Sequence, residues 1–549
     1  MKSLAFLLLA LLCILNTDLQ AQQDLANKYD KILAEEFLIE GPGATALIAK
    51  NGKIIYKNAV GHANVELDVP MQVNNVFRIG SITKQFTAVA ILMLEEQGKL
   101  SLQDEITKFI EDYPTQGKTI TIEHLLTHTS GIKSYTNVPE FMGRTREDLE
   151  PMQVIDFFKD IEMEFEPGDQ WNYNNSGYFI LGAVIEKVAG KSYAAFIEEE
   201  IFDKLGMENS YYDSYPKIIP HRAAGYQMDD KGLKNADYLS TTLPYAAGSL
   251  LSNVEDLYKW NQAVKNHKLI SEASLKKAWT PYELNNGEAT HYGYGWGTGK
   301  LQGTRAIEHG GGIFGYLTQA AYLPEEDLFV AVFSNCNCQG AERAAQMLAA
   351  EAMGKPLYFE PIEVEVATLK QYEGVYKSSE EESRVILVKE GTLISKRGND
   401  RIYNLIPIGE DEFQFEDSFT RLKFEKNGAG EIVKATSITA GGKEEVAMKT
   451  EEKPVLEERK SIKLSDEVLN QYVGTYELMK GFNVKITNEN NQLMAHPTGQ
   501  NKEALNASSE TKFHPTTVEA EVEFFKEDGK VTHLVLKQGG REMKGKKIE

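Results

Sequence analysis

The sequence predicts a multidomain α/β protein that ends in two small all-β modules, and three observations lead to this prediction. The chain has 549 residues, too many for one ordinary hydrophobic core, so about two to four domains are expected. Its first part opens with two strand-like runs, 44–50 and 53–59, on either side of Asn51-Gly52, the strongest short hairpin signal. Its last part repeats, because Leu369-Lys370-Gln371-Tyr372-Glu373-Gly374-Val375-Tyr376 returns 100 residues later as Leu469-Asn470-Gln471-Tyr472-Val473-Gly474-Thr475-Tyr476.

The first 21 residues are typical of a signal peptide. Lys2 supplies a short basic region, Leu4 to Leu15 an apolar one, and Leu19-Gln20-Ala21 a cleavage site. Leu12 before Cys13 is too bulky for a lipoprotein attachment site. No later segment reaches the ~18 apolar residues of a membrane span. We therefore expect an exported protein, periplasmic or extracellular, with no membrane span.

Charge and cysteine content narrow the possible partners. The formal net charge of −22 and the pI near 5.1 disfavour nucleic acid or an anionic membrane as a partner. Outside the predicted signal peptide only Cys336 and Cys338 remain, and no second Cys/His cluster accompanies them. We expect two free thiols or one small local disulfide here, with no metal and no other cofactor.

The strongest chemical signal is the pair Ser81 and Lys84. Three residues apart, the two side chains share one face of a helix. The residues from Phe86 to Leu94 are almost all apolar or small, which predicts a helix buried in the middle of a domain, and Gly98 ends the pattern. Four other Ser-x-x-Lys pairs occur, none of them at the start of a long apolar helix: Ser130/Lys133, Ser214/Lys217, Ser274/Lys277 and Ser509/Lys512.

The segment 122–131 places His128 close to Ser130. The two side chains point to different faces in a helix or a strand, and the chain contains no Gly-x-Ser-x-Gly elbow. We interpret this segment as a structural helix end.

A second chemical signal is Tyr173-Asn174-Asn175. A Pro-Gly turn precedes it, and an apolar helix from Phe179 to Val188 follows. Tyr-x-Asn also occurs at Tyr56/Asn58 and at Tyr135/Asn137. Tyr56 lies in the middle of a predicted strand and is a poor candidate, whereas Tyr135 lies in a polar loop and stays open.

The segment 244–260 predicts a turn and then a helix to Trp260, and a Gly/aromatic run follows at 293–297. Gly310 to Gly315 then matches Gly-x-Gly-x-x-Gly, but a strand-like run, 316–322, follows where a Rossmann fold needs a helix. Small residues here instead allow a substrate backbone to lie along a strand edge. A strand at 328–333 and a helix at 341–353 complete this part.

In this order, Ser81-Ile82-Thr83-Lys84, Tyr173-Asn174-Asn175 and His309-Gly310-Gly311 resemble the penicillin-recognising serine hydrolases, which include class C β-lactamases, D-Ala-D-Ala carboxypeptidases, D-aminopeptidases and related esterases. The resemblance covers about residues 25–355. It implies an α/β sandwich of antiparallel sheet and helices with an all-helical lobe. The repeated tail is similar to lipocalin-like barrels, and we expect domains at 22–360, 361–455 and 456–549.

The resemblance also implies acyl transfer. Ser81 would be the nucleophile, with Lys84 or Tyr173 as its base, and the choice between the two stays open. A free phenol or amine titrates near pH 10, so burial and neighbouring charges must lower one of the two pKa values. Asn175 would position the substrate amide and the Lys84 amine.

At the third motif, His309 takes the place of a lysine, and Gly311 and Gly312 leave room beside the strand. The amides of Ser81 and Gly312 would form the oxyanion hole. An unperturbed imidazole titrates near pH 6.5, so we expect partial charge on His309 and carboxylate recognition that fades as pH rises. The expected substrates are small peptides, amides or esters, with D-amino-acid preference. A β-lactamase, or a slowly turning-over penicillin-binding sensor, is the alternative.

Overall fold

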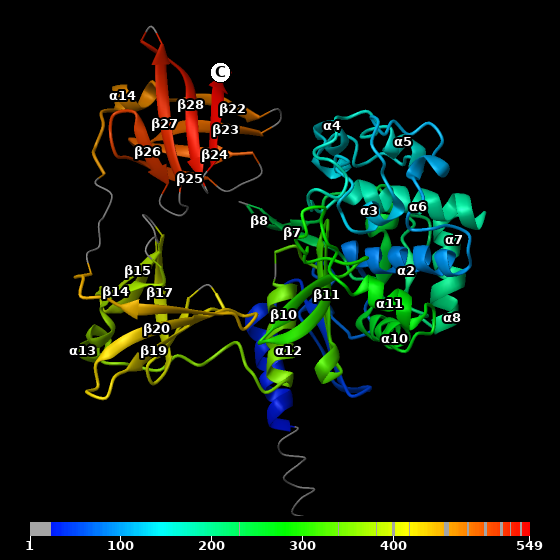
Figure 1. Ribbon diagram of the computed structural model, residues 1–549, viewed down its shortest axis with the longest axis horizontal. Coiled ribbons are helices and arrows are strands. Elements are labelled where there is room, and N and C mark those ends of the chain that lie inside the picture. The colour runs from blue at the N-terminus through cyan, green and yellow to red at the C-terminus, as the bar shows by residue number, and fades with distance from the viewer. Residues whose placement is uncertain are drawn as a thin grey trace, which may run out of the picture. The chain divides into compact units, whose positions relative to one another are not determined.

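The computed structural model describes residues 23–548 except 230, 339, 380–381, 398–400, 417, 455–460, 480–481, 499–501, 516–519, 528 and 539–540 (Figure 1). The predicted signal peptide lies outside the described residues. The chain divides into two compact units, Met1–Tyr358 and Phe359–Glu549.

The first unit is built on a six-stranded antiparallel sheet with the order β10-β11-β12-β13-β1-β2. All seven residues of β13 are buried, in keeping with its continuous apolar run. Because β1 pairs with β13, with Ala44 opposite Ser334, the two ends of this unit share one sheet. The strands are β1 (Ala44–Lys50), β2 (Lys53–Val60), β10 (Gly297–Leu301), β11 (Thr304–Ile313), β12 (Tyr316–Leu323) and β13 (Leu328–Ser334).

The predicted hairpin joins β1 to β2. Asn51 and Gly52 have φ values of 52° and 74°. Positive φ at both positions is what a two-residue type I′ turn needs, and Asn-Gly reaches it at little cost.

Helices cover both faces of the sheet (Figure 1). A helix over residues 23–36 and α12 (Ala341–Ala352) lie on one side. A larger helical part with α2 (Thr83–Glu96), α6 (Asn175–Ala189) and α10 (Val254–Lys265) lies on the other. Both α10 and α12 pack against β13 and β1. This agrees with the predicted sandwich and helical lobe.

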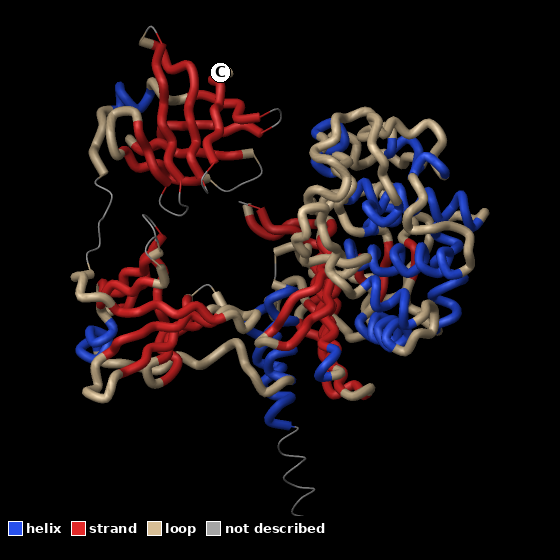
Figure 2. The backbone as a smooth tube through the Cα atoms, viewed as in Figure 1, coloured by secondary structure: helices blue, strands red, loops and turns tan. Residues whose placement is uncertain are grey.

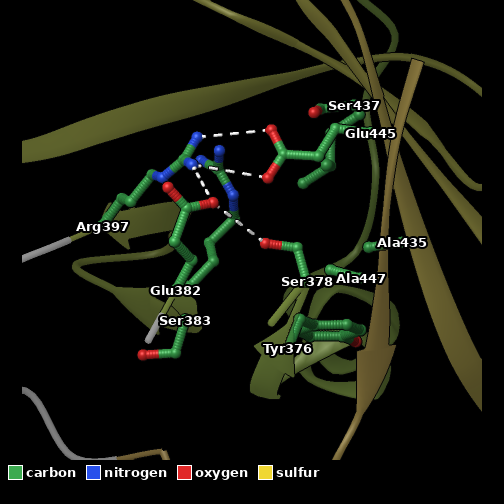
Figure 3. A pocket seen from close by; sticks show the side chains of 11 residues that line it. Tyr376, Ser378, Glu382, Ser383, Arg397, Ala435, Ser437, Glu445 and Ala447 are labelled. Carbon is green, nitrogen blue, oxygen red and sulfur yellow. Dashed lines mark hydrogen bonds and ion pairs between the residues drawn. The ribbon is translucent and has the colours of Figure 1, made fainter. Parts of the chain in front are cut away.

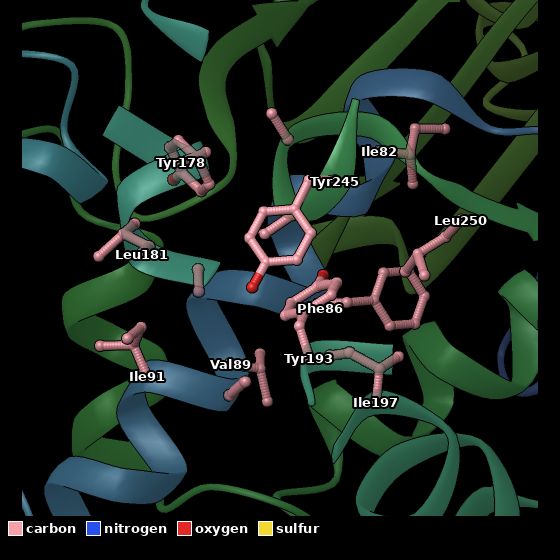
Figure 4. Close-up of a cluster of buried hydrophobic side chains, with 14 of the residues drawn as sticks. Ile82, Phe86, Val89, Ile91, Tyr178, Leu181, Tyr193, Ile197, Tyr245 and Leu250 are labelled. Atoms are coloured by element: carbon pink, nitrogen blue, oxygen red, sulfur yellow. The ribbon is translucent and has the colours of Figure 1, made fainter. Parts of the chain in front are cut away.

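Helix α2 runs through the middle of the helical part. Every residue from Thr83 to Leu94 is buried, as the unbroken apolar pattern predicts. The Phe86 ring stacks on Trp260 of α10 with centroids 4.0 Å apart, and other apolar side chains surround it (Figure 4). Gly98, at φ 68°, ends the helix. The start of α2 is therefore held by tight packing.

Shorter elements complete the unit. A helix was expected from Leu250 to Trp260, but the structure has α9 (Tyr245–Gly248) and the strand β9 (Leu250–Ser252) before α10, which runs on to Lys265. Helix α10 begins only at Val254, because the Asn253 side chain caps it by accepting the Asp256 N–H. The remaining helices are α3 (Ile122–Leu126), α4 (Pro139–Met142), α5 (Pro151–Ile155), α7 (Tyr193–Ile197), α8 (Asp203–Leu205), α9 (Tyr245–Gly248) and α11 (Glu272–Ala278). Its described residues also form the 3-10 or π turns η1 (Gly80–Ile82), η2 (Ile106–Lys108), η3 (Tyr135–Asn137), η4 (Glu198–Phe202) and η5 (Pro324–Glu326). The small sheets are formed by β3 (His62–Asn64) with β4 (Val69–Pro70), by β5 (Phe77–Arg78), β9 (Leu250–Ser252) and β6 (Tyr211–Tyr212), and by β7 (Tyr226–Asp229) with β8 (Gly232–Asn235).

The second unit contains two closed antiparallel barrels of eight strands each. In the tube of Figure 2 this unit is mostly strand, drawn in red. The first barrel follows α13 (Val366–Leu369) and η6 (Lys370–Tyr372), and the second follows α14 (Asp466–Asn470). The first comprises β14 (Gly374–Lys377), β15 (Ser383–Lys389), β16 (Thr392–Arg397), β17 (Arg401–Gly409), β18 (Glu412–Phe415), β19 (Arg421–Lys426), β20 (Ile432–Ile438) and β21 (Glu444–Lys449). The second comprises β22 (Gly474–Met479), β23 (Phe482–Glu489), β24 (Gln492–Pro497), β25 (Glu503–Ala507), β26 (Lys512–Pro515), β27 (Ala520–Glu527), β28 (Lys530–Gln538) and β29 (Arg541–Lys547).

The repeated Tyr-x-Gly-x-Tyr sequence has the same role in both barrels. The hydroxyl of Tyr376 donates to the Tyr372 carbonyl at 2.7 Å, and that of Tyr476 donates to the Tyr472 carbonyl at 2.8 Å. Each barrel closes by pairing its first strand with its last, with Tyr376 opposite Lys449 and Tyr476 opposite Lys547. The motif therefore buries a tyrosine at each closing seam.

Two further predictions concern cysteine and membrane segments. Cys336 and Cys338 form a local disulfide, which was one of the two expected states. None of the described helices is long and apolar enough to cross a membrane.

Candidate active site

Ser81 and Lys84 lie together where the buried helix α2 begins. Ser81 is the middle residue of η1, and α2 follows directly from it. Lys84 is fully buried, and its Nζ lies 3.1 Å from Ser81 Oγ. The structure thus brings the predicted pair into hydrogen-bond contact.

The other four Ser-x-x-Lys pairs differ in the partner of the lysine. In each of them a glutamate forms an ion pair with the amine: Glu164 with Lys133, Glu198 with Lys217, Glu95 with Lys277, and Glu521 and Glu523 with Lys512. A neighbouring carboxylate favours the protonated amine, which cannot accept a proton from serine. Ser81 and Lys84 lack this obstacle, because the atoms around Lys84 are uncharged.

Three oxygen atoms surround the Lys84 amine. Besides Ser81 Oγ, these are Asn175 Oδ1 at 2.8 Å and the Ala247 carbonyl at 2.9 Å. Asn175 opens α6 and Ala247 lies in α9, so helices distant in sequence meet here. Burial lowers the pKa of Lys84 well below that of an ordinary lysine. The lower pKa increases the fraction of neutral amine, the form that can act as a base.

Tyr173 lies beside this amine, with its ring centroid 4.9 Å from Lys84 Nζ. The Tyr173 hydroxyl is buried and makes no hydrogen bond of normal geometry within the described part of the chain. Burial raises the pKa of Tyr173, and the nearby Ser81 hydroxyl offsets only part of that rise. Tyr173 therefore keeps its proton at neutral pH.

The two other Tyr-x-Asn segments hold their tyrosines differently. Tyr56 lies in β2, and its hydroxyl donates to Asp30 at 2.7 Å. Tyr135, the candidate left open, is buried, and its hydroxyl donates to the Leu243 carbonyl at 2.9 Å. Tyr173 is thus the tyrosine of the three whose ring contacts Lys84.

Both ring nitrogens of His309 have partners. Nδ1 lies 2.6 Å from the Gly310 carbonyl, which can only accept, so Nδ1 carries the hydrogen. Nε2 lies 2.7 Å from the Tyr292 hydroxyl and accepts a hydrogen bond from it. Burial, aided by the nearby Lys84, lowers the pKa of His309 to about 3. The side chain is therefore neutral at pH 7.

This environment corrects the expectation of a partly charged His309. That expectation used the pKa of an imidazole in water, about 6.5, whereas the His309 side chain is only 7% exposed. A substrate carboxylate therefore meets no imidazolium at this position near neutral pH. Binding should not change as the pH passes 6.5.

An aromatic cluster that the sequence analysis missed supports these residues. The His128 ring lies 4.4 Å from the Tyr173 ring and 4.6 Å from the Tyr292 ring, between centroids. His128 Nδ1 accepts the N–H of Asn174 at 3.1 Å, which holds the residue next to Tyr173. His128 was expected in a structural helix end, and its contacts are structural, but they fix the candidate site. For Tyr292, the available signal was its position beside the Gly/aromatic run at 293–297.

Strand β11 presents a free edge next to Ser81. Strand β10 pairs with β11 only over Thr304–Glu308, so among the described strands none covers this edge at His309–Ile313. A Cβ on Gly311 would lie 2.0 Å from the Ile79 carbonyl, so glycine is required for this close approach. A Cβ on Gly80, at φ +50°, would lie 3.0 Å from the Gly312 nitrogen. The Gly312 amide therefore lies beside the turn that holds Ser81.

A cavity of about 180 Å³ opens at this place. Ser81, Asn175 and Gly312 line it. Lys84 does not line the cavity but contacts Ser81 and Asn175, which do. Gly311 is packed against Ile79. Within the described ranges, no group of three or more His, Cys, Asp or Glu side chains could hold a metal ion.

Comparisons with known proteins identify the family of this chain. Residues 33–353 match the β-lactamase family, and residues 458–547 match a domain of unknown function, DUF3471. Over 298 residues the chain is 35% identical to penicillin-binding protein 4* of Bacillus subtilis, covering 50% of this chain and 64% of that protein. Over 327 residues it is 26% identical to a D-aminopeptidase of Gluconobacter oxydans, covering 58% and 60%.

A solved structure shows the same similarity. The octameric penicillin-binding protein homologue from Pyrococcus abyssi superimposes with a TM-score of 0.54 at 27% identity, over 78% of this chain and 99% of that one. The chain spans less than two thirds of the length of the two curated relatives. The family match covers more than half of the 549 residues. The chain therefore belongs to the β-lactamase family.

Proposed function

We propose that this protein is an exported serine hydrolase that cleaves small peptides, amides or esters through an acyl-enzyme on Ser81, with preference for D-amino-acid substrates. The observation that carries the proposal is the set of contacts around Lys84 Nζ. The D-preference is supported by the similarity to the D-aminopeptidase.

The contacts of Lys84 favour this residue as the base for the first proton. A neutral amine has two N–H groups and one lone pair. Asn175 Oδ1 and the Ala247 carbonyl can only accept, so they take the two N–H groups. The lone pair is left for the Ser81 hydroxyl, 3.1 Å away. These contacts support Lys84 over Tyr173 as the base of the first step, the choice that the sequence left open.

In acylation, Ser81 Oγ attacks the substrate carbonyl carbon while its proton moves to Lys84 Nζ. The carbonyl oxygen becomes an oxyanion, which the amides of Ser81 and Gly312 would bind. A donor of this kind contributes about 3–4 kcal/mol to transition-state stabilisation. Collapse of the intermediate breaks the bond to the leaving group, which takes up a proton that Lys84 replaces. Water then hydrolyses the ester on Ser81 and releases the acid.

Tyr173 suits the second proton transfer better than the first. Its raised pKa keeps the phenol protonated, so it can donate to the leaving group and regain a proton from Lys84. The centroid of the Tyr173 ring lies 4.9 Å from Lys84 Nζ, and the Ser81 hydroxyl lies near the phenol oxygen, so in this proposal the bound substrate or a water molecule relays the proton between the two groups.

A fluorophosphonate tests the nucleophile. It should label the protein at Ser81, mapped by mass spectrometry, and Ser81→Ala should abolish both labelling and hydrolysis. Ser214→Ala is a matched control, because Ser214 has the same spacing to Lys217, an amine that is paired with Glu198. Labelling at another serine, or full activity in Ser81→Ala, would contradict the proposal. For export, mass spectrometry of protein recovered outside the cytoplasm should find a mature N-terminus after Ala21.

Kinetic assays distinguish the proposed function from the two alternatives, a β-lactamase and a slow penicillin-binding sensor. A β-lactamase would hydrolyse a penicillin or cephalosporin with kcat/KM at least a hundredfold above that for D-alanine p-nitroanilide, about 2.7 kcal/mol of transition-state preference. A slow penicillin-binding sensor would give a stoichiometric burst of acylation with almost no later turnover. The proposal requires sustained turnover of the amide or ester.

A further inference from the structure

We infer that the first barrel contains a binding site for the carboxylate group of a small organic acid, with Arg384 as the cation that holds it. The inference concerns the second unit of the chain and does not rest on the role proposed for Ser81. The two are related through chemistry alone. Hydrolysis of an amide or ester releases a carboxylate, so the acid product of the proposed function belongs to this class of ligand.

Arg384 lines an opening that runs from the core of the first barrel to its surface. The floor of the opening consists of buried core residues, which are Tyr376, Leu422 and Ala435. Its rim consists of charged side chains that are 37–54% exposed, which are Glu382, Arg397 and Glu445 (Figure 3). A ligand can therefore approach Arg384 from solvent.

The second barrel has apolar residues at the positions that are polar around Arg384. Arg384 stands opposite Tyr376, whereas Val484 stands opposite Tyr476. The strand pairings match four further polar residues with apolar ones: Ser395 with Ala495, Arg397 with Pro497, Ser437 with Leu536, and Glu445 with Met543. Because the barrel also closes on apolar residues here, the polar cluster of the first barrel indicates a role other than closure.

Arg384 is fixed in place and keeps one edge of its guanidinium free. Nη1 donates to Ser395 Oγ at 2.7 Å, and the guanidinium carbon lies 5.1 Å from the centroid of the Phe415 ring. Among the described residues, Nε and Nη2 have no hydrogen-bond acceptor. The N–H groups of these two nitrogens point the same way, which is the arrangement that binds both oxygens of a carboxylate.

The glutamates of the rim do not occupy this edge. Glu382 and Glu445 both form ion pairs with Arg397, and within the described ranges neither forms one with Arg384. The two arginines and the two glutamates carry no net charge together. A monoanion therefore adds one negative charge to the cluster, whereas a phosphate dianion would be repelled by both glutamates twice as strongly. This difference favours a carboxylate over a phosphate.

The unfilled space in the opening limits how much of a ligand can enter. It measures about 10 Å³, about the room that one water molecule needs. A ligand can therefore place its carboxylate beside Arg384, while the rest of the molecule stays at the rim. We expect short acids to bind.

Propionate and propionamide, which have nearly the same shape, test the inference in the full-length protein. Saturation-transfer difference NMR at pH 7 measures the Kd of each. We expect propionate to bind at least about tenfold more tightly, because hydrogen bonds between charged groups are roughly twice as strong as neutral ones. Equal affinities would overturn the inference. Displacement of propionate by inorganic phosphate at a lower concentration than by acetate would overturn it as well.

Substitutions show whether the signal comes from Arg384. Arg384→Gln should weaken propionate binding at least about tenfold and leave propionamide unchanged. Arg421→Gln is the matched control, because Arg421 of β19 also lies over an aromatic ring, that of Phe359, but forms an ion pair with Glu412. This control should bind propionate like the wild type. Full propionate binding by Arg384→Gln would overturn the inference.

Arg384→Lys keeps the charge and removes the two parallel N–H groups, so propionate should bind at least about threefold more weakly. If Arg384→Gln does not fold, Arg384→Lys decides the question, and an affinity equal to that of the wild type would contradict the two-oxygen contact. None of these measurements involves turnover. Absence of fluorophosphonate labelling at Ser81 would contradict the proposed function and leave this inference intact, so the two failures are distinguishable.

Discussion

Two basic side chains, Lys84 at the start of α2 and Arg384 in the first barrel, are largely removed from water in different ways. The partners of Lys84 are three uncharged oxygen atoms. Arg384 donates to Ser395 Oγ at 2.7 Å and lies over the Phe415 ring. Burial lowers the pKa of Arg384, and the Glu445 carboxylate offsets part of that change. A lysine amine can lose its proton when buried, whereas a guanidinium stays charged. The difference indicates that the environment of Lys84 favours a neutral base, and that of Arg384 a permanent cation.

Around Arg384 the charges are balanced. The side chain of Arg397 points toward Glu382 and Glu445 and forms ion pairs with both (Figure 3). The second barrel has no such group at the equivalent place, because Val484 stands opposite Tyr476 where Arg384 stands opposite Tyr376. The same barrel therefore closes with or without a cation at this place, which indicates that the fold does not require it.

The largest effect that tests this comparison should come from Lys84→Met. We expect a loss in kcat/KM between about 10²- and 10⁴-fold, because the base for Ser81 is removed. Fluorophosphonate labelling should slow in parallel, while far-UV circular dichroism stays unchanged. Arg384→Met is the matched control in the barrel, and its kcat/KM should equal that of the wild type. Equal losses in the two variants would refute the distinction.

The next effect concerns pH. Because the pKa of Lys84 is lowered by burial, acylation should increase with pH through a limb below the ordinary lysine value of about 10.4. Lys84→Met should lack this limb. No limb near pH 6.5 should belong to His309, whose pKa is about 3.

The free energy of unfolding should also depend on pH because of Lys84. Between the lowered pKa of Lys84 and about 10.4, the unfolded chain binds a proton that the folded chain does not. The free energy of unfolding of the wild type should therefore increase with pH in this window, relative to Lys84→Met. Urea unfolding at several pH values measures this. A difference that is independent of pH would mean that Lys84 is charged in the folded state.

A smaller effect is expected from Arg384→Val, which copies the second barrel. Loss of the hydrogen bond to Ser395 from a charged donor should reduce the free energy of unfolding by about 1.5–3 kcal/mol. Adding Ser395→Ala, the residue found at 495 opposite Ile486, should recover part of that loss, because no buried hydroxyl is then left without its donor. A double variant as unstable as the single one would contradict this.

The smallest effect should come from Arg397→Gln. The Arg397 side chain is 41% exposed, and exposed ion pairs contribute about 0–1 kcal/mol. Thermal unfolding at low and high salt should differ little from the wild type. A loss above about 2 kcal/mol would mean that Arg397 and Arg384 act as one network.

The sequence predicted the elements that carry short, ordered motifs, and it missed those that only the fold brings together. The apolar run after Lys84 predicts α2, and Asn51-Gly52 predicts the hairpin, because both are local signals. Ala247 offers no side-chain signal at all, since its backbone carbonyl contacts Lys84 across 163 positions. The expected pKa of His309 was wrong for the same reason. The burial of the ring and its contact with the Tyr292 hydroxyl are properties of the folded site, which the sequence does not show.

The closing seams of the two barrels have a consequence for folding. Each seam joins strands whose paired tyrosine and lysine are more than 70 positions apart, 376 with 449 and 476 with 547. Pairings of such long range form late and slowly. Before closure, the first strand of each barrel exposes the edge that later pairs with the last strand, and the last strand of the adjacent repeat has a lysine in the matching place. We therefore expect the neighbouring barrels to exchange strands in some molecules during folding, a misassembly typical of repeated domains.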